Sequence, residues 1–354
     1  MKSIKIIKNQ TVGGGDRYCN NVIAELKKNY KVQILSPESL RINSKSVIFS
    51  LWEYVKYVYF YLPHYYKKLG RSITNDKNNE IIIVFQDAYR KCPDIFQTLK
   101  LKSLYILHEP PREFYEPLNL HAPRLKDKIF TLIIRLPIYF IDRSNTKKAS
   151  IIISNSKFSS ENIKKIYKKK SKVIYPGLNI FSKERLVRQY QCISVGSLLP
   201  YKGHLTLIRA VSLISKKKPS IVIVGNGSEE QKNELLLEAL KNNVKLKIIS
   251  NITDRTLGSL YRKSSVYVNC AYKEPFGMTS LEGLGHGCSL VTTDRCGTEE
   301  LKRFFPNNIF VSNGEINDIS KKIELALNIN MTKYDYSIFS WKKVASELIK
   351  TLIK

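Results

Sequence analysis

Apolar and polar residues alternate with two different periods along this chain, and the pattern predicts an α/β protein. Short apolar runs typical of buried parallel strands alternate with stretches in which apolar residues recur at helical spacing. The chain opens with an apolar run at 3–7, a glycine turn at 10–16 and an amphipathic pattern at 17–28. Predicted strands lie at 3–7, 31–36, 80–85, 103–107, 151–154, 172–175, 192–195, 221–224, 246–250, 266–270 and 289–293. Because strand and helix alternate, we expect doubly wound α/β domains, which bind ligands at the carboxyl ends of their strands.

The length of the chain and one polar segment divide it into two domains. A chain of 354 residues is longer than one ordinary core requires. The segment 181–189 is polar and basic, so it is the expected linker. We predict an N-terminal domain at 1–183 and a C-terminal domain at 184–334, with a final helix at 335–354 that packs back on the first domain.

The balance of charge favours polyanionic partners. The chain has 59 Lys and Arg against 30 Asp and Glu, a net charge of +29. Nucleic acid and an anionic membrane surface are both attracted by such a charge. The basic residues are spread along the chain and match no nucleic-acid-binding signature, so we expect a membrane surface and no nucleic acid as a partner.

The cysteines and the apolar segments indicate a reducing compartment and no membrane-spanning helix. The six cysteines form no Cys-x-x-Cys pair, which favours buried free thiols. The N-terminal residues predict a strand and not a signal peptide, and the apolar segment 129–141 is interrupted by Arg135 and Pro137. We therefore expect a cytoplasmic protein that is peripheral on the inner face of the cell membrane.

Two stretches combine apolar or aromatic residues with basic ones. Residues 48–69 carry many aromatic rings among lysines. Such a helix suits either a lipid headgroup boundary or an aromatic core, and the sequence leaves both open. Residues 123–148 have the pattern of a long basic amphipathic helix.

The residues that point most directly to a chemistry lie at 274–282, which read EPFGMTSLE. The apolar run 266–270 predicts a buried strand before them, and the proline followed by Phe-Gly predicts a corner into a helix. At this corner, backbone N–H groups would point out of the helix N-terminus, where anions bind. The residues that would provide them are Gly277, Met278 and Thr279. Glu274 and Glu282 would flank these donors as fixed acceptors, which describes a nucleotide-sugar site better than a metal site.

Three further loops supply candidate residues. Lys202 precedes a predicted helix, where a cation and free N–H groups converge on phosphate. The turn that contains Gly14 and Gly15 follows the first strand and lets the backbone approach a ligand closely. His108 follows the strand 103–107 and begins a proline-stiffened loop, so we expect it to face the ligand-binding edge of the sheet.

The stretch 274–282 resembles the glutamate-seven-glutamate motif of the retaining glycosyltransferases of family 4. The segments 153–158 and 173–179 are similar to the end of the N-terminal domain in that family, and loops like His-Glu-Pro-Pro-Arg at 108–112 occur in its bacterial and archaeal members. The resemblance implies the GT-B architecture, in which two Rossmann-like domains face each other across a cleft. The C-terminal domain would hold a UDP- or GDP-linked sugar, the N-terminal domain would hold the acceptor, and no metal or other cofactor would be required.

The same resemblance implies roles for individual residues. The catalytic residues would be His108, Lys202 and Glu274. The donor would contact Gly14, Gly15, Ser197, Lys202, Glu274, Phe276, Gly277, Met278, Thr279 and Glu282. Arg112 would lie on the acceptor side. Family members usually carry an arginine at the position of Ser197, and Arg17 or Arg112 would have to replace its charge.

We therefore expect an enzyme that moves a hexose from a nucleotide diphosphate to a cell-envelope, polysaccharide or lipid-linked glycan acceptor with retention of anomeric configuration. The alternatives are a nucleotide-sugar epimerase of the same architecture, a catalytically inactive family member and a basic nucleic-acid-binding protein. Paired carboxylates would repel a polyanion, which argues against the last of these.

Overall fold

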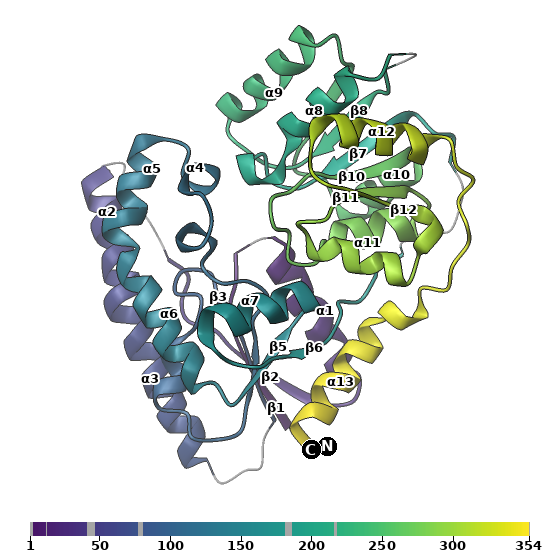
Figure 1. The fold of residues 1–354 in the computed structure, drawn as a ribbon. Helices are drawn as coiled ribbons and strands as arrows, with labels where there is room; N and C mark the ends of the chain where they lie inside the picture. The colour runs from purple at the N-terminus through teal and green to yellow at the C-terminus, as the bar shows by residue number, and fades with distance from the viewer. Residues whose placement is uncertain are drawn as a thin grey trace. The chain divides into compact units, whose positions relative to one another are not determined.

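Two α/β units, each built on a six-stranded parallel sheet, make up the computed structural model of this chain (Figure 1). The structure describes residues 3–11, 13–40, 47–76, 81–180, 186–215 and 218–353. The first unit comprises Met1–Asn155, Ser159–Pro176 and Trp341–Lys354, and the second comprises Ser156–Phe158 and Gly177–Ser340. The second unit begins its long segment at Gly177. Residues 181–185 of the expected linker lie outside the described residues, so the division at 183/184 stays a prediction.

The sheet of the first unit has the strand order β2-β1-β3-β4-β5-β6. Its strands are β1 (Ser3–Asn9), β2 (Lys31–Leu35), β3 (Ile81–Asp87), β4 (Leu104–Ile106), β5 (Ile151–Ser154) and β6 (Lys172–Val173). Ile6 lies in register with Ile34 on one side and with Ile83 on the other. Isoleucine-rich strands such as these suit a sheet that is covered on both faces.

The helices of the first unit are α1 (Gly14–Leu26), α2 (Val47–Lys56), α3 (Leu62–Asn75), α4 (Leu118–His121), α5 (Leu125–Ile129), α6 (Leu136–Lys148), most of α7 (Lys157–Tyr167) and α13 (Trp341–Ile353). α13 comes from the end of the chain and packs against α1 (Figure 1). Within the residues that the structure describes, no helix is both long and apolar enough to cross a membrane.

Neither long basic helix predicted from the sequence is a regular α-helix. A wider π-helical turn at Tyr57–Tyr61 separates α2 from α3, and another at Phe130–Ile134 separates α5 from α6. A proline follows each wide turn, at the start of α3 and of α6. Because proline has no N–H to donate to the preceding turn, it breaks the regular pattern of helical hydrogen bonds at both places.

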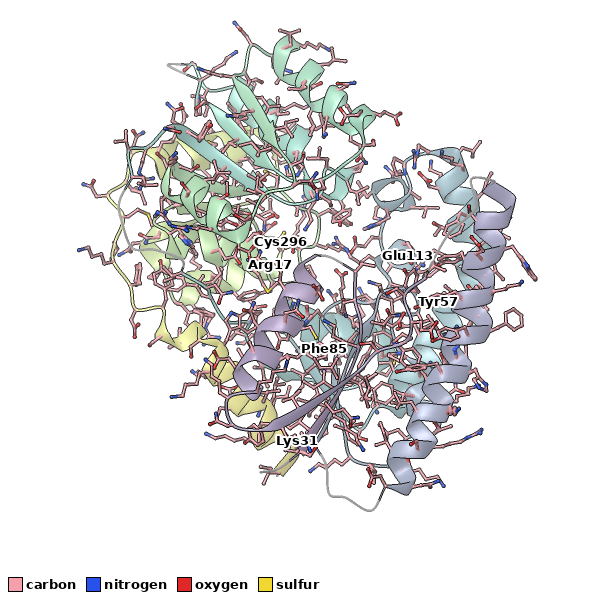
Figure 2. The ribbon with its side chains drawn as sticks, turned by 180° about the vertical axis from the view of Figure 1, so that it is seen from behind. Arg17, Lys31, Tyr57, Phe85, Glu113 and Cys296 are labelled. Carbon is pink, nitrogen blue, oxygen red and sulfur yellow. The ribbon has the colours of Figure 1, made fainter. Side chains whose placement is uncertain are left out.

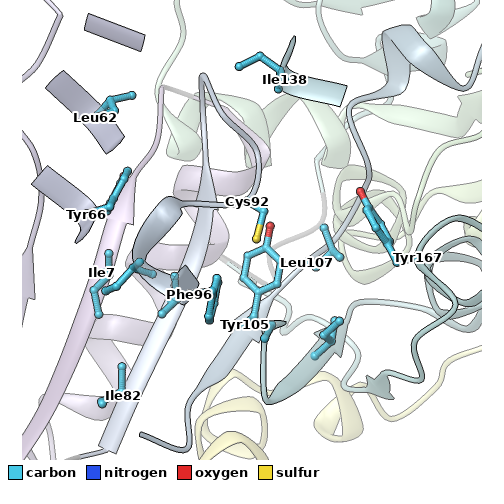
Figure 3. Close-up of a cluster of buried hydrophobic side chains, with 14 of the residues drawn as sticks. Ile7, Leu62, Tyr66, Ile82, Cys92, Phe96, Tyr105, Leu107, Ile138 and Tyr167 are labelled. Atoms are coloured by element: carbon cyan, nitrogen blue, oxygen red, sulfur yellow. The ribbon is translucent and has the colours of Figure 1, made fainter. Parts of the chain in front are cut away.

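The aromatic residues of α2, its wide turn and α3 belong mainly to the core. Tyr57, Leu62 and Tyr66 are buried, and most other tyrosines of the segment pack against the same cluster. Figure 3 shows this cluster, in which Tyr66 lies near Ile7. Of the two interpretations that the sequence left open, the structure therefore favours the aromatic core for these tyrosines.

The sheet of the second unit has the order β12-β11-β10-β7-β8-β9. Its strands are β7 (Tyr190–Val195), β8 (Ile221–Val224), β9 (Leu246–Ile249), β10 (Ser264–Asn269), β11 (Ser289–Thr293) and β12 (Ile309–Ser312). Its helices are α8 (His204–Ser212), α9 (Glu229–Lys241), α10 (Asp254–Arg262), α11 (Met278–Gly285) and α12 (Ile316–Leu327). The chain builds outward from β7 to β9 and then returns to pair β10 with β7 on its other side. The point between β7 and β10 is where the strand order reverses, and ligands of open α/β sheets bind there.

Candidate functional site

The loops that follow β7 and β10 meet at the switch point of the second sheet. Ile193 and Tyr267 lie in register, so both strands end at the same edge. The backbone N–H of Tyr272 donates to the carbonyl of Tyr201 over 2.7 Å, which joins the two loops directly. Gly203 has a φ of +71°, and a Cβ placed there would lie 2.1 Å from the carbonyl oxygen of Cys270. Only glycine fits at this contact, because its conformation is left-handed and the backbone opposite leaves no room.

The two loops bring Lys202 and Glu274 together. The Nζ atom of Lys202 lies 2.7 Å from Oε2 of Glu274, and about four-fifths of each side chain is buried, with 20% and 18% exposed. Burial by itself would lower the pKa of the Lys202 ammonium, but the carboxylate of Glu274 raises it overall, so the ammonium stays charged. Removing one partner of such a pair leaves an unpaired, partly buried charge. The pair is therefore a fixed cation beside a fixed hydrogen-bond acceptor.

The corner between β10 and α11 holds a left-handed glycine. Gly277 has a φ of +79°, and its missing Cβ would lie 2.4 Å from Oγ1 of Thr298. The Thr298 hydroxyl donates to the carbonyl of Phe276 over 2.9 Å and accepts from the amide of Asn269 over 3.0 Å. The N–H of Gly297 donates to the carbonyl of Glu274 over 2.8 Å. These bonds fix the backbone that carries Glu274 and the start of α11.

The first turn of α11 presents backbone donors at this corner. Met278 and Thr279 begin the helix, where N–H groups have no partner within the helix itself. The Tyr267 hydroxyl lies 2.7 Å from Oγ1 of Thr279 and 3.3 Å from the carbonyl of Val195, so it links the first turn of α11 to the end of β7. A helix N-terminus carries partial positive charge and binds anions. The corner therefore offers N–H donors on the same edge of the sheet as the Lys202–Glu274 pair.

Of three other residues that were predicted to contact the sugar donor, Glu282 and Phe276 are buried and Ser197 is half-buried. Glu282 is 6% exposed on α11, and its Oε2 accepts from the hydroxyl of Tyr261 over 3.2 Å. The Phe276 ring is fully buried, so this residue offers its backbone and not its ring. The Ser197 hydroxyl lies 3.5 Å from that of Tyr201, and its carbonyl oxygen lies 3.2 Å from Nε2 of His204.

The first unit has its own polar edge at the ends of β1, β3 and β4. The side-chain oxygen of Gln86 accepts from the N–H of His108 over 3.1 Å, and its amide nitrogen donates to the carbonyl of Glu109 over 2.5 Å. The side chain of Gln10 donates to the carbonyl of Gln86. Gln86 thus ties the loop before α1 to the loop that begins with His108. Gly14 and Gly15 form the start of α1 at this edge.

His108 is a neutral imidazole with both ring nitrogens buried. Among the described residues neither nitrogen has a hydrogen-bond partner, and the ring lies edge-on against Tyr18 with the two centroids 4.5 Å apart. Burial lowers the pKa of His108 to about 4, although the carboxylate of Glu109 acts in the opposite direction. Buried polar atoms without a partner are uncommon in proteins and often belong to functional sites. The ring can donate one hydrogen bond and accept another once a partner reaches it.

Arg112 is already paired within its own loop. Its guanidinium group contacts Glu116 at 2.9 Å and Glu109 at 3.8 Å, and the residue is buried. The charge of Arg112 is therefore neutralised by these carboxylates, which weakens its expected use as a replacement for a cation at Ser197. Its expected place on the acceptor side stays a prediction.

The cysteines form no disulfide, and the described acidic residues form no metal-binding cluster. All six cysteines are free, as their spacing predicted, and the thiol of Cys296 (Figure 2) donates to the carbonyl of Ala271 over 2.9 Å. Among the residues that the structure describes, no three His, Cys, Asp or Glu side chains gather closely enough to hold a metal ion.

The sequence did not predict three residues that hydrogen-bond to the corner between β10 and α11, namely Tyr267, Asn269 and Thr298. Tyr267 and Asn269 lie on a strand that was recognised only for its apolar residues, and Thr298 lies 22 positions beyond Phe276. A polar residue at the carboxyl end of a buried strand, as Asn269 is, was the available signal. The contact with Thr298 depends on the fold and has no local signal.

Acidification is expected to destabilise the second unit through His204. The residue is 3% exposed, and burial lowers its pKa to about 4, with Lys202 contributing in the same direction and the carbonyl of Ser197 opposing it. Between the unfolded pKa of 6.5 and the folded value of about 4, the unfolded state binds more protons, so the free energy of unfolding falls as the pH falls. Denaturant unfolding measures the free energy of unfolding at about pH 6.5 and at about pH 4.5. The decrease between the two pH values should be about 2 kcal/mol smaller in His204→Gln than in wild type. An equal decrease in the free energy of unfolding in both proteins would show that His204 does not have a lowered pKa in the folded state.

The fold and part of the sequence match known proteins. Residues 178–337 match the family Glycosyl transferases group 1. An uncharacterized glycosyltransferase of Methanocaldococcus jannaschii is 26% identical over 241 residues, which cover 60% of this chain and 62% of that relative, less than two thirds of its length. An uncharacterized glycosyltransferase of Haemophilus influenzae is 25% identical over 333 residues, 90% of this chain and 88% of the relative. HepE of Anabaena, solved in complex with UDP and glucose, matches 100% of both chains with a TM-score of 0.69 and 13% identity.

These matches agree with the two parallel six-stranded sheets of the structure. The predicted α/β fold class with two Rossmann-like domains is confirmed. The protein has the GT-B fold, and its residues 178–337 match the Glycosyl transferases group 1 family.

Proposed function

We propose that this protein is a retaining hexosyltransferase that uses a UDP- or GDP-linked sugar. The observation that carries the proposal is the Lys202–Glu274 pair, 2.7 Å apart, on the sheet edge from which α11 begins. A diphosphate needs positive charge and N–H donors, and a sugar needs acceptors for its hydroxyl groups. The edge between β7 and α11 provides all three.

In the proposed complex, the ammonium of Lys202 and the first-turn N–H groups of α11 bind the diphosphate. Glu274 accepts hydrogen bonds from sugar hydroxyls, and Glu282 accepts from the ribose. His108 contacts the transferred sugar or the acceptor through a ring nitrogen that lacks a protein partner. The solved relative from Anabaena, which holds UDP and glucose, supports this choice of donor class.

The proposed reaction breaks the bond between the anomeric carbon and the diphosphate oxygen and forms a bond from that carbon to the acceptor oxygen. The acceptor hydroxyl attacks from the face that the diphosphate leaves, and its proton passes to the departing phosphate oxygen. The anomeric configuration is then retained. Negative charge grows on the diphosphate as the bond breaks, so a fixed ammonium and fixed N–H donors stabilise the transition state more than the bound donor.

We propose a glycan or lipid-linked acceptor of the cell envelope, in line with the resemblance to family 4. The position of Ser197 bears on how active the enzyme is, because family members usually have an arginine there. Its hydroxyl carries no charge, so Lys202 would be the main cation contributed by the loop after β7.

Incubation of the purified protein with labelled UDP-hexoses and GDP-hexoses tests the proposal. We expect one donor to lose its sugar, by transfer or by slow hydrolysis, with release of the nucleotide diphosphate. Glu274→Gln should lower this rate by about tenfold or more, since a neutral amide accepts hydrogen bonds from hydroxyl groups more weakly than a carboxylate does.

Analysis of the products separates the alternatives. An epimerase would change the configuration of the sugar in the recovered donor, whereas a transferase releases the nucleotide and leaves unreacted donor unchanged. A folded protein that releases no nucleotide from any donor would contradict the proposed function and favour an inactive family member.

A further inference from the structure

One helical segment of the first unit turns an apolar face to solvent. α5, the wide turn after it and the start of α6 carry six large apolar side chains that are each 44% to 73% exposed. These six residues, which we term the apolar stripe, are Leu125, Ile129, Leu132, Ile133, Leu136 and Phe140. A contiguous exposed apolar surface of this kind marks an interaction site in a soluble domain.

The spacing places the stripe on a single face. The intervals from Leu125 are four, seven, eight, eleven and fifteen residues, the pattern of one side of a helix. The opposite side of the segment is buried through Thr131, Ile138 and Asp142. Ile138 belongs to the core cluster of the unit (Figure 3), and Asp142 accepts from the hydroxyl of Tyr167 over 2.6 Å. The buried side therefore fixes which face points outward.

Neighbouring residues hold the segment firmly in place. Arg135 pairs with Glu113 at 2.6 Å and donates to the hydroxyl of Tyr54 over 2.8 Å. Glu113 is labelled in Figure 2. The hydroxyl of Tyr59 donates to the carbonyl of Ile134. Because the segment is already ordered, a partner that covers the stripe would not have to order it first.

The charges around the stripe are mostly positive. Residues 124–148 contain seven Lys and Arg against two Asp. One of these acids, Asp142, is buried, and the other, Asp127, pairs with Arg124 at 2.7 Å. Lys126 and Lys147 are exposed. An apolar face bordered by cations matches the surface of an anionic bilayer, where apolar side chains enter the acyl boundary and cations meet the headgroups.

We propose that the apolar stripe and its basic border bind the surface of an anionic lipid bilayer. A second copy of the chain fits the stripe less well, because its net charge of +29 would oppose the same basic border. The proposal does not depend on the donor chemistry of the second unit. Where the proposed function also holds, the bilayer would bring this unit close to lipid-linked acceptors.

Exposed apolar residues without a basic border should not bind an anionic bilayer, and α9 provides such a case. Leu237 and Leu240 are 65% and 78% exposed, yet α9 carries four glutamates against two lysines. An anionic bilayer would repel this helix. Leu237 and Leu240 therefore provide matched control positions of similar exposure.

Flotation of the full chain with lipid vesicles tests the proposal. Wild type should float with vesicles of phosphatidylcholine and phosphatidylglycerol, more at low salt than at high salt, and poorly with phosphatidylcholine alone. The double variant Ile133→Glu with Phe140→Glu should lower the partition coefficient by about tenfold or more. The control Leu237→Glu with Leu240→Glu should leave it within about twofold of wild type.

A second variant, Lys126→Glu with Lys147→Glu, tests the basic border and should weaken binding only to the anionic vesicles. Thermal unfolding and hydrolysis of the nucleotide-sugar donor should stay unchanged in both variants, so a failure of the membrane proposal is distinguishable from a failure of the donor site. The proposal would be overturned if wild type failed to float with anionic vesicles at both salt concentrations. It would also be overturned if the Ile133→Glu, Phe140→Glu variant floated as well as wild type. So would a wild-type dimer in light scattering that this variant dissociates, because a second copy would then cover the stripe.

Discussion

Replacing Lys202 by alanine is expected to lower kcat/KM for the nucleotide-sugar donor by about a hundredfold to a thousandfold. The variant loses the ammonium that would face the departing diphosphate. It also leaves the carboxylate of Glu274, which is 18% exposed, without the partner that now lies 2.7 Å away. Release of the nucleotide diphosphate, followed at several donor concentrations, measures the effect.

Lys232→Ala is the matched control for this substitution. Lys232 also pairs with a glutamate, Glu229, at 2.6 Å, but this pair lies on α9 and the side chain of Glu229 is 80% exposed. Its loss should leave kcat/KM within about twofold of wild type, since surface ion pairs contribute little. If Lys202→Ala behaved like this control, the ammonium of Lys202 would have no part in the reaction.

Replacing Gly203 by alanine is expected to lower the free energy of unfolding by about 2 to 4 kcal/mol. The φ of +71° is strained for alanine, and the new Cβ would lie 2.1 Å from the backbone carbonyl of Cys270. The loop of Lys202 would have to move away from β10, so donor turnover should fall as well. Denaturant unfolding and the nucleotide-release assay measure the two effects separately.

Gly287→Ala separates the effect of backbone strain from the effect of the collision with Cys270. Gly287 also has a positive φ, +92°, but no atom of the residues that the structure describes lies within 4 Å of the position of its Cβ. This substitution should lower stability by only about 1 kcal/mol and leave turnover unchanged, because it carries the backbone strain without the collision. Equal losses of stability and turnover in Gly203→Ala and Gly287→Ala would show that close contact between the Lys202 loop and the end of β10 is not required for either property.

The alternation of strands and helices was sufficient to predict the fold class, because parallel strands buried on both faces read as short apolar runs. The sequence also located the loop of Lys202 and the corner at Gly277, since strand ends and helix starts have local signals. The pairing of β7 with β10 places these segments on one edge of a sheet, although 72 residues separate Lys202 from Glu274.

Local sequence patterns did not predict the wide helical turns or the burial of the aromatic residues. The wide turns at Tyr57–Tyr61 and Phe130–Ile134 depend on how each proline fits against its neighbours, so the sequence predicted continuous helices in their place. The aromatic rings of residues 48–69 gave the same pattern for a core and for a membrane surface. Packing against the sheet decides between them, and it buries Tyr57 and Tyr66.

Burial also decides what the charged and polar candidates can do. Arg112 was a candidate cation on residue type alone, and its partner Glu116 is four residues away in the same loop. His204 lies at the start of α8 with a ring nitrogen 3.2 Å from the carbonyl of Ser197, and no local pattern marks this contact. Such pairings depend on side-chain directions that the sequence does not encode locally.

Calorimetric titration of wild type and Lys202→Ala with UDP, GDP and the corresponding monophosphates tests the central claim most directly. We predict that one of the two diphosphates binds wild type, that Lys202→Ala weakens this binding by about tenfold or more, and that the monophosphates bind weakly and equally to both proteins. Failure of both diphosphates to bind wild type, or an unchanged Kd in Lys202→Ala, would contradict the claim that Lys202 and the start of α11 form a nucleotide-diphosphate site.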